Sequence, residues 1–387
     1  MRQHFTHHQR YIIVAIISLF LPFYMYAIVI AFLTIRLLIT GEIQDAYKRI
    51  PRSQFLLLFC LLSLIVSLFY QNYYGVACTI ALLVFFSFML FYRVYITHEL
   101  FTFITDLLVV LSIFAAFYGL IEYIGVLNNY EINQFEVIIF NSPQDRINSV
   151  FFNANYYAMM IEFFVCLIFY KILKMKDYKQ HMNYLIYYIF AIALNLFLLV
   201  LTGCRTAWPA LAVGIVMMLL LDKHYKTCSV ILAGVITVCG YFLFNPKKFP
   251  RFDNILSYFK AREKIWSTAI ANIKTHFLFG EGPMTYMHIY EQYDGHPTQH
   301  AHSVYLDPLL CFGVVGLASI APYVVSMLKG IYHLFSKKLD LELFALIIAY
   351  ILIVLIHGTM DYTIFFVQTG MLFLLICSSY EIYTNAS

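Results

Sequence analysis

Four histidines lie close together in the sequence, shortly before a long apolar run. A neutral imidazole can bind a metal ion, and it can also take a proton from a hydroxyl group because histidine titrates near neutral pH. A third interpretation is that these are surface histidines without a function. The spacing lacks the tight, helix-compatible pattern or the carboxylate partners of most metal sites, so we predict no metal site here. The four residues are His288, His296, His300 and His302.

His302 is the best candidate among them for a general base. It borders the apolar run that begins near Ser303, so a rigid helix is expected to fix its position. His300 lies further out in the preceding loop. We therefore expect His302 to carry out proton transfer and His300 to take no part in it.

Arg205 stands in a very short turn between two apolar runs, in the stretch LTGCRTAWPA. A cation in such a turn needs an anionic partner. That partner is either a membrane phosphate, contacted by a snorkelling side chain, or a phosphate-bearing lipid substrate. The planar guanidinium group binds two phosphate oxygens at once, which makes arginine more suitable than lysine for a phosphate site.

Two acidic residues, Glu162 and Asp106, fall inside apolar runs. Ionisable residues within a membrane are candidates for function, but a carboxyl group can equally be neutral and hydrogen-bonded to a neighbouring helix. The sequence assigns neither residue a role.

The elements that must position these residues are membrane spans. Of the 387 residues, 62% are hydrophobic and 12% are charged, whereas about a quarter of the residues in a soluble domain are charged. The net charge of +4 comes without a basic stripe, so we expect no nucleic acid partner. The eight cysteines are scattered without a CxxC pair, which predicts neither a disulfide framework nor a zinc site. The first apolar run has no cleavage site after it and is expected to be retained.

Ten apolar runs are clear candidates for spans, since a span needs about 20 apolar residues. Residues 11–40 contain Pro22 and form either one overlong helix or two short ones. With the second alternative, the fold is an all-α polytopic membrane protein of about twelve transmembrane segments. The ten runs are 55–70, 75–92, 100–126, 151–170, 184–201, 207–221, 227–244, 303–328, 342–357 and 364–380.

Short loops rich in lysine and arginine mark the cytoplasmic side of a membrane protein. Three basic connections fit one alternating orientation, and the basic N-terminus lies on the same side if residues 11–40 cross twice or re-enter. We therefore expect both termini in the cytoplasm and the loops 127–150, 202–206, 245–301 and 358–363 on the extracytoplasmic face. The basic residues are Lys171, Lys174, Lys176 and Lys179, then Lys223 and Lys226, and then Lys329, Lys337 and Lys338.

The long loop 245–301 is expected to contain an amphipathic helix at the outer membrane surface. Its apolar residues recur near helical spacing until Gly280 and Gly282 end the pattern. The helix either carries site residues such as Arg262 and Trp266 or only caps the bundle. We expect one integrated membrane domain made of an N-terminal bundle (1–244), this loop (245–301) and C-terminal spans (302–387). The apolar positions are Ile255, Phe259, Ile265, Trp266, Ile270 and Ile273.

Five stretches carry a further pattern: RINSVFFNANYYAMMIEF (146–163), TGCRTAW (202–208), AREKIWSTAIANIKTHFLFGEGP (261–283), HAHSVYLDPLLCFGVVGL (300–317) and HGTMDYTIFFVQTGMLFLL (357–375). Together they resemble the O-antigen ligase and O-antigen polymerase superfamily of bacterial surface-polysaccharide enzymes. Cys204 stands where that family usually has serine, and Ser303 stands where it usually has asparagine. The family's proline before its paired glycines is replaced by His276 or Phe277. The first 140 residues are similar only in hydropathy.

The resemblance implies a reaction at the extracytoplasmic face of the plasma membrane. Such enzymes move a glycan from a polyprenyl-pyrophosphate carrier to a hydroxyl of a lipid-anchored or glycan acceptor, without a cofactor or a metal ion. By the same resemblance, Arg205 and Arg262 bind the pyrophosphate, and His302 deprotonates the acceptor for an inverting attack. The resemblance fits ligases and polymerases alike. The residues expected to support the site are Ser303, Trp266 and Tyr305.

Two other classes of function stay open on the sequence. One is a lipid-linked glycan flippase or another multi-span transporter, although such proteins commonly show internal duplication and this chain has no evident repeat. The other is a sensor or structural subunit in which the histidines respond to pH or to a metal ion.

Overall fold

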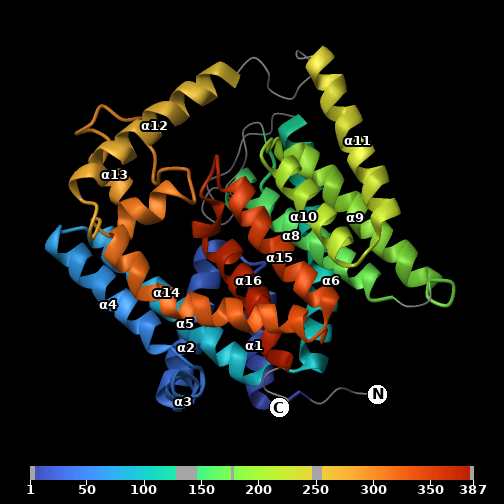
Figure 1. Cartoon of the computed structure of the whole chain (residues 1–387), viewed down its shortest axis with the longest axis horizontal. Helices are drawn as coiled ribbons and strands as arrows, with labels where there is room; N and C mark the ends of the chain where they lie inside the picture. Colours follow the sequence, from blue (N-terminus) through green and yellow to red (C-terminus); the bar gives the residue numbers. More distant parts are fainter. Residues whose placement is uncertain (1–4, 128–145, 176–177, 246–254, 384–387) are drawn as a thin grey trace.

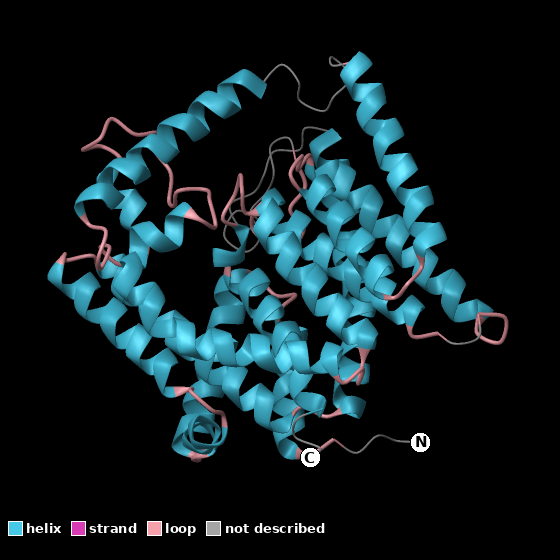
Figure 2. Cartoon of the chain, viewed as in Figure 1, coloured by secondary structure: helices cyan, strands magenta, loops and turns pink. Residues whose placement is uncertain are grey.

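The protein is helical throughout the part of the chain that the structure describes (Figure 1) (Figure 2). The computed structural model describes residues 5–127, 146–175, 178–245 and 255–383, and within these ranges it contains helices and turns but no strand. The predicted all-α class is confirmed for them. Parts of two predicted outer loops, 128–145 and 246–254, lie outside the described residues, as does the predicted cytoplasmic Lys176.

The order of helices follows the order of apolar runs in the sequence. The helices are α1 (His7–Ser18), α2 (Phe23–Ile39), α3 (Glu42–Arg49), α4 (Gln54–Phe69), α5 (Tyr73–Tyr95), α6 (His98–Leu127), α8 (Ala154–Leu173), α9 (Met182–Thr202), α10 (Ala207–Leu221), α11 (Tyr225–Phe244), α12 (Ile255–Thr275), α13 (Thr285–Ile289), α14 (Leu306–Ser336), α15 (Leu341–His357) and α16 (Val367–Ser378), with the short 3-10 helices η3 (Thr363–Phe365) and η4 (Ser379–Tyr383).

Five of the described helices, α5, α6, α8, α9 and α14, are long and apolar enough to cross a membrane. A sixth span arises if α2 and α3, which meet at an angle of 82°, are taken as one broken segment. Helices α4, α10 and α15 are apolar but shorter, as is the part of α11 from Tyr225 to Thr237. The protein is therefore a helical membrane protein, while the count of about twelve segments stays a prediction.

Residues 11–40 form two helices, because the chain breaks between Ser18 and Phe23. Pro22 has no N–H group to continue α1, and its ring disfavours helical geometry in the residue before it. The break is stabilised from a distant segment, since the side-chain amide of Gln368 donates to the carbonyl oxygens of Leu19 and Leu21 at 2.7 and 2.8 Å. The alternative of one overlong helix is excluded.

Helix α8 lies at the centre of the molecule and packs against α9, α10 and α15 (Figure 1). Every residue from Tyr157 to Ile168 is buried. A polar side chain on this helix has to find its partner within the protein, because it is shielded from water.

Helix α14 is kinked at Gly313, whose φ of 57° and ψ of −176° are not helical. At the kink, the backbone N–H groups of Val314 and Val315 have no acceptor within the helix. They donate instead to the carbonyl oxygens of Phe277 and Leu278, in the segment after α12, at 3.0 and 2.9 Å. A Cβ atom at Gly313 would stand 2.4 Å from the Leu278 oxygen, so only glycine fits.

The amphipathic helix expected within residues 245–301 is present as α12, which ends at Thr275. Its apolar residues Ile265, Ala269 and Ile273 are buried against Tyr286 and against Leu310, which lies at the start of α14. The helix thus covers α13 and α14 and holds the following chain in place. That chain leads directly to His300 and His302.

Candidate active site

The central feature of the site is a histidine–carboxylate pair. The Nδ1 atom of His302 lies 2.6 Å from Oδ1 of Asp361. His302 comes from the loop before α14, and Asp361 comes from the turn between α15 and η3. The two segments are joined by a hydrogen bond of 2.8 Å from the Val304 N–H to the Gly358 carbonyl. This hydrogen bond holds the two turns together and so brings His302 and Asp361 into contact.

The backbone at His302 adopts a left-handed conformation, with φ of 48°. This conformation is uncommon for a residue other than glycine and is often found at functional sites. The local structure holds it in place, because the Ala301 N–H donates to Asp307 at 2.7 Å and Ser303 lies buried at the start of α14.

The carboxylate of Asp361 fixes which nitrogen of His302 carries the proton. Since a carboxylate only accepts, Nδ1 donates to it, and Nε2 keeps its lone pair. The hydroxyl of Thr298 lies 2.9 Å from Nε2 and donates to it. A substrate hydroxyl that replaces Thr298 at this nitrogen can lose its proton there.

Asp361 is 3% exposed and is surrounded by donors. Its Oδ1 also accepts from the Tyr362 N–H at 2.8 Å, and its Oδ2 accepts from the side-chain amide of Asn155. Burial alone would raise the pKa of Asp361, but the hydrogen bond from His302 and the positive charge of Arg262 lower it well below its ordinary value. The residue is a carboxylate throughout the physiological pH range.

A chain of hydrogen bonds connects this pair to the turn that carries Arg205. Asn155 binds Asp361 with its amide nitrogen and accepts from Arg146 with its amide oxygen. Arg146 also donates from Nε to the carbonyl oxygen of Thr202 at the end of α9. Helix α8, the α15 turn and the α9–α10 turn are thereby held as one unit.

The two arginines expected to bind phosphate converge on one aromatic ring. The guanidinium carbon of Arg205 lies 5.1 Å from the centre of the Tyr258 ring, and that of Arg262 lies 4.7 Å from it. Arg262 is 7% exposed and donates from Nε to the carbonyl oxygen of Met360 at 3.0 Å. Since Met360 precedes Asp361, the arginines lie beside the histidine–carboxylate pair.

The four histidines of the sequence cluster separate in space. His300 and His302 stay together, with ring centres 4.3 Å apart. His288 instead binds the side chain of Asn72 at 3.1 Å, and His296 bonds to the backbone of Pro297. Burial, then the neighbouring charge of His302, lower the pKa of His300 to about 3. His300 is thus neutral at physiological pH.

The three residues expected to support the site differ in their contacts. Ser303 Oγ accepts from the backbone N–H groups of Tyr305 and Leu306 at 3.3 and 3.4 Å, which helps to start α14. Tyr305 is 55% exposed, and its hydroxyl donates to the carbonyl oxygen of Leu355. Trp266 packs against the apolar cluster between α12 and α14.

The two intramembrane acids have different surroundings. Asp106 forms an ion pair with Lys171, in which Oδ1 and Nζ lie 2.7 Å apart. Glu162 is fully buried and lies 2.8 Å from Nδ1 of His357, whose other nitrogen is 3.8 Å from the sulfur of Cys204. His357 ends α15, shortly before the turn that carries Asp361, and Cys204 directly precedes Arg205.

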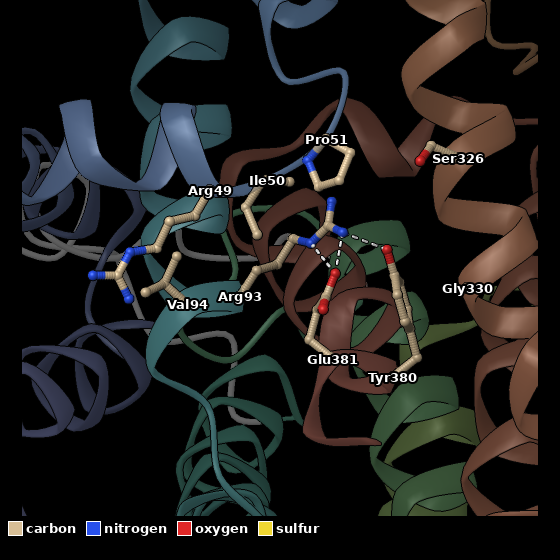
Figure 3. Close-up of a pocket in the computed structure, with 9 residues that line it drawn as sticks. All are labelled: Arg49, Ile50, Pro51, Arg93, Val94, Ser326, Gly330, Tyr380 and Glu381. Atoms are coloured by element: carbon tan, nitrogen blue, oxygen red, sulfur yellow. Dashed lines mark hydrogen bonds and ion pairs between the residues drawn. The ribbon is translucent and has the colours of Figure 1, made fainter. Parts of the chain in front are cut away.

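A cavity of about 490 Å³ opens at another part of the molecule (Figure 3). It is lined by residues of the α3–α4 turn, the C-terminal end of α5, the second half of α14 and η4. In it, Arg93 forms a buried ion pair with Glu381 and donates to the hydroxyl group of Tyr380 (Figure 3). Arg93 also donates to the hydroxyl group of Tyr323. The cavity contains none of the predicted site residues.

The sequence of residues 190–321 matches the family model described as O-antigen ligase. This match covers about a third of the chain and supports the resemblance to the O-antigen ligase superfamily that was stated from the sequence. The matched segment contains Arg205, Arg262 and His302. No curated protein matches the chain.

At the level of the family, the match supports a membrane glycosyltransferase of the ligase or polymerase type. The matched family implies a lipid-linked glycan donor and a glycan acceptor in general terms. Asp361 and Asn155 fall outside the matched segment, yet they complete the site around His302. Sequence reasoning did not single them out, although Asp361 stands in a predicted outer turn and Asn155 in a stretch that carries the resemblance.

Proposed function

We propose that the protein transfers a glycan from a polyprenyl-pyrophosphate carrier to a sugar hydroxyl during bacterial surface-polysaccharide assembly. The observation that carries the proposal is the position of the His302–Asp361 pair beside two guanidinium groups. The reaction requires a base that takes the proton of the acceptor hydroxyl and cationic groups that bind the pyrophosphate.

His302 acts as the general base. Its Nε2 takes the proton of the acceptor hydroxyl while that oxygen forms a bond to the anomeric carbon of the donor. The bond from this carbon to the pyrophosphate oxygen breaks, and the polyprenyl pyrophosphate leaves with the electron pair. Because attack and departure occur on opposite sides of the carbon, the configuration is inverted. Asp361 stabilises the imidazolium that forms, as a buried carboxylate does beside a catalytic histidine.

Arg205 and Arg262 bind the pyrophosphate and stabilise the charge that develops as it leaves. Their stacking on Tyr258 holds two cations close together before the donor arrives, so little reorganisation is needed when the anion binds. With the arginines in this role, the transfer needs neither a metal ion nor another cofactor.

The proposed site faces the extracytoplasmic side of the plasma membrane, with both termini in the cytoplasm. The distribution of lysine and arginine in short loops supports this orientation. The three parts 1–244, 245–301 and 302–387 then act as one integrated membrane domain. Trp266 and Tyr305 stand at the edge of the site, where aromatic faces can pack on sugar rings.

The test separates a transferase from a flippase, which is the main alternative. The purified protein is placed in vesicles with a polyprenyl-pyrophosphate-linked oligosaccharide and an acceptor glycan. We expect new glycosidic bonds and release of polyprenyl pyrophosphate. Movement of the lipid-linked glycan between leaflets without bond formation would favour a transporter.

A second measurement distinguishes ligase from polymerase. In a deletion strain, the size profile of the surface glycan is compared with that of the parent strain. Loss of long chains while single repeat units stay attached indicates a polymerase. Accumulation of long chains on the polyprenyl lipid indicates a ligase.

A further inference from the structure

Three potential metal ligands meet in the site. His300, His302 and Asp361 each offer one ligand atom, and these atoms all lie within 4.8 Å of one another. Asp361 is 59 positions from His302, so spacing along the chain did not indicate that the two residues meet.

The donor set fits a borderline divalent cation. Two imidazole nitrogens and one carboxylate oxygen are typical ligands of Zn²⁺, whereas Mg²⁺ and Ca²⁺ prefer oxygen ligands throughout. Ligand atoms of a tetrahedral zinc site stand about 3.4 Å apart, as bonds of about 2.0–2.1 Å require. Nδ1 of His302 and Oδ1 of Asp361 are 2.6 Å apart, which is a hydrogen-bond distance, so an ion between them moves the two atoms apart by about 1 Å or less. All three ligand atoms lie within 4.8 Å of one another, close to the spacing that the ion requires.

The site is accessible from one side. His300 and Asp361 are 5% and 3% exposed, whereas the side chain of His302 is 19% exposed. The hydroxyl of Thr298 lies 2.9 Å from Nε2, the ring nitrogen of His302 that does not face Asp361. Three protein ligands with one open position are the arrangement of an accessible zinc site, not of a closed structural one.

We propose that His300, His302 and Asp361 form an inhibitory binding site for Zn²⁺. The inference rests on the proposed role of His302 as the base. An ion bound between Nδ1 of His302 and Asp361 displaces the Nδ1 proton and ends the hydrogen bond to the carboxylate. The ring proton then lies on Nε2, which can no longer take the proton of the acceptor hydroxyl. Ion binding and glycan transfer therefore exclude one another.

The surrounding charge limits the affinity. The guanidinium group of Arg262 acts on both His300 and Asp361, and it repels a cation. We therefore expect reversible binding that a chelator removes. Mg²⁺ should not compete, since it binds imidazole poorly.

The first experiment measures binding without reference to activity. The full chain is purified in detergent, stripped with a chelator and titrated calorimetrically with ZnCl2, with MgCl2 as the comparison. We expect one Zn²⁺ site and no heat from Mg²⁺ at the same concentrations. Absence of Zn²⁺ binding overturns the proposal, whatever the enzyme does.

The decisive variant is His300→Asn, which removes the imidazole but keeps a side-chain acceptor for the His302 N–H that His300 now receives at 3.3 Å. We expect transfer activity close to wild type and a Zn²⁺ affinity lower by about tenfold or more, since even outer-shell changes cost about 10- to 100-fold. The matched control is His296→Asn, which lies outside the set and should bind Zn²⁺ as wild type does.

Activity assays complete the test. Zn²⁺ should inhibit the wild type and the His296→Asn variant, EDTA should restore both, and His300→Asn should resist inhibition. Equal Zn²⁺ binding by wild type and His300→Asn, or stimulation of transfer by Zn²⁺, overturns the proposal. If His302→Gln retains transfer activity, the proposed base is wrong, and the calorimetric result still decides the metal site by itself.

Discussion

His302 and Asp361 are 59 positions apart in the sequence, and their side chains lie 2.6 Å apart in the structure. The contact joins the loop that follows α13 to the turn that follows α15. Neither turn alone contains a base with its orienting carboxylate. The proposed chemistry therefore depends on the two turns being held together.

Replacement of Asp361 by asparagine tests the orienting carboxylate. Asparagine has nearly the same shape, but it no longer fixes the His302 tautomer or stabilises the imidazolium. We expect the turnover number to fall by about 10²- to 10⁴-fold, with little change in the concentration of donor needed for half-maximal rate. Initial rates of glycosidic bond formation give both constants. The control is Asp294→Asn, since the Asp294 side chain is 97% exposed; equal activity of the two variants would remove Asp361 from the mechanism.

Lysine in place of Arg205 or Arg262 tests the phosphate clamp. Lysine keeps the charge but loses the planar fork that binds two oxygens, and it packs less well on Tyr258. We expect kcat/KM to fall by about tenfold or more for each variant, as loss of one charge-assisted hydrogen bond costs about 1.5–3 kcal/mol. Arg49→Lys is the matched control, because Arg49 is exposed and pairs with Asp45. An unchanged rate in Arg205→Lys would leave Arg205 as a residue that only contacts membrane phosphates.

The stability of the protein should depend on pH through His300. Burial, then the charge of His302, lower the pKa of this residue to about 3, and an unfolded histidine titrates near about 6.5. As the pH falls between these values, the unfolded state binds a proton that the folded state does not. The stabilisation is therefore complete above about pH 6.5 and is lost as the pH falls toward 3.

Thermal unfolding in detergent with EDTA measures this effect. From pH 7 to pH 4.5, the Tm of His300→Asn should fall less than the Tm of the wild type. Asp361 contributes little to the difference in this range, since its depressed pKa matters only below the ordinary aspartate value of about 3.9. The control His296→Asn should follow the wild type. Parallel curves for wild type and His300→Asn would show that His300 does not titrate in this way.

The kink in α14 should tolerate no side chain. In Gly313→Ala the new Cβ atom would stand 2.4 Å from the Leu278 oxygen, on a backbone with φ of 57°. We expect a loss of about 2 kcal/mol or more, with a lower Tm and a lower yield of folded protein. Gly234→Ala in α11 is the control, because nothing lies within 4 Å of its added Cβ atom and alanine favours a helix. Equal Tm values for the two variants would contradict the steric account.

Much of this architecture could be read from hydropathy, because apolar runs and helical periodicity are local properties. Helices α5, α6, α8 and α9 begin and end within a few residues of the predicted runs. The amphipathic helix of the outer loop was also predictable from spacing. The surface against which α12 packs could not be predicted, because its contact with Tyr286 and Leu310 arises from tertiary packing.

The candidate site, too, could be predicted only in part from the sequence. His302, Arg205 and Arg262 were proposed from residue type, predicted loop position and resemblance to a family, and their roles stay predictions. Asp361 and Asn155 could not be paired with His302, because a single sequence gives no information on which distant turns meet. The His300–His302–Asp361 set was missed for the same reason, and the prediction of no metal ligands rested on spacing along the chain.

The most direct test of the account is the transfer rate of His302→Gln with a purified lipid-linked glycan and acceptor in vesicles. Glutamine can still form hydrogen bonds, but it cannot take the acceptor proton at neutral pH. We predict that glycosidic bond formation falls by about 10²- to 10⁴-fold, while donor binding stays within a few-fold of wild type. A rate near that of the wild type would contradict the assignment of His302 as the base.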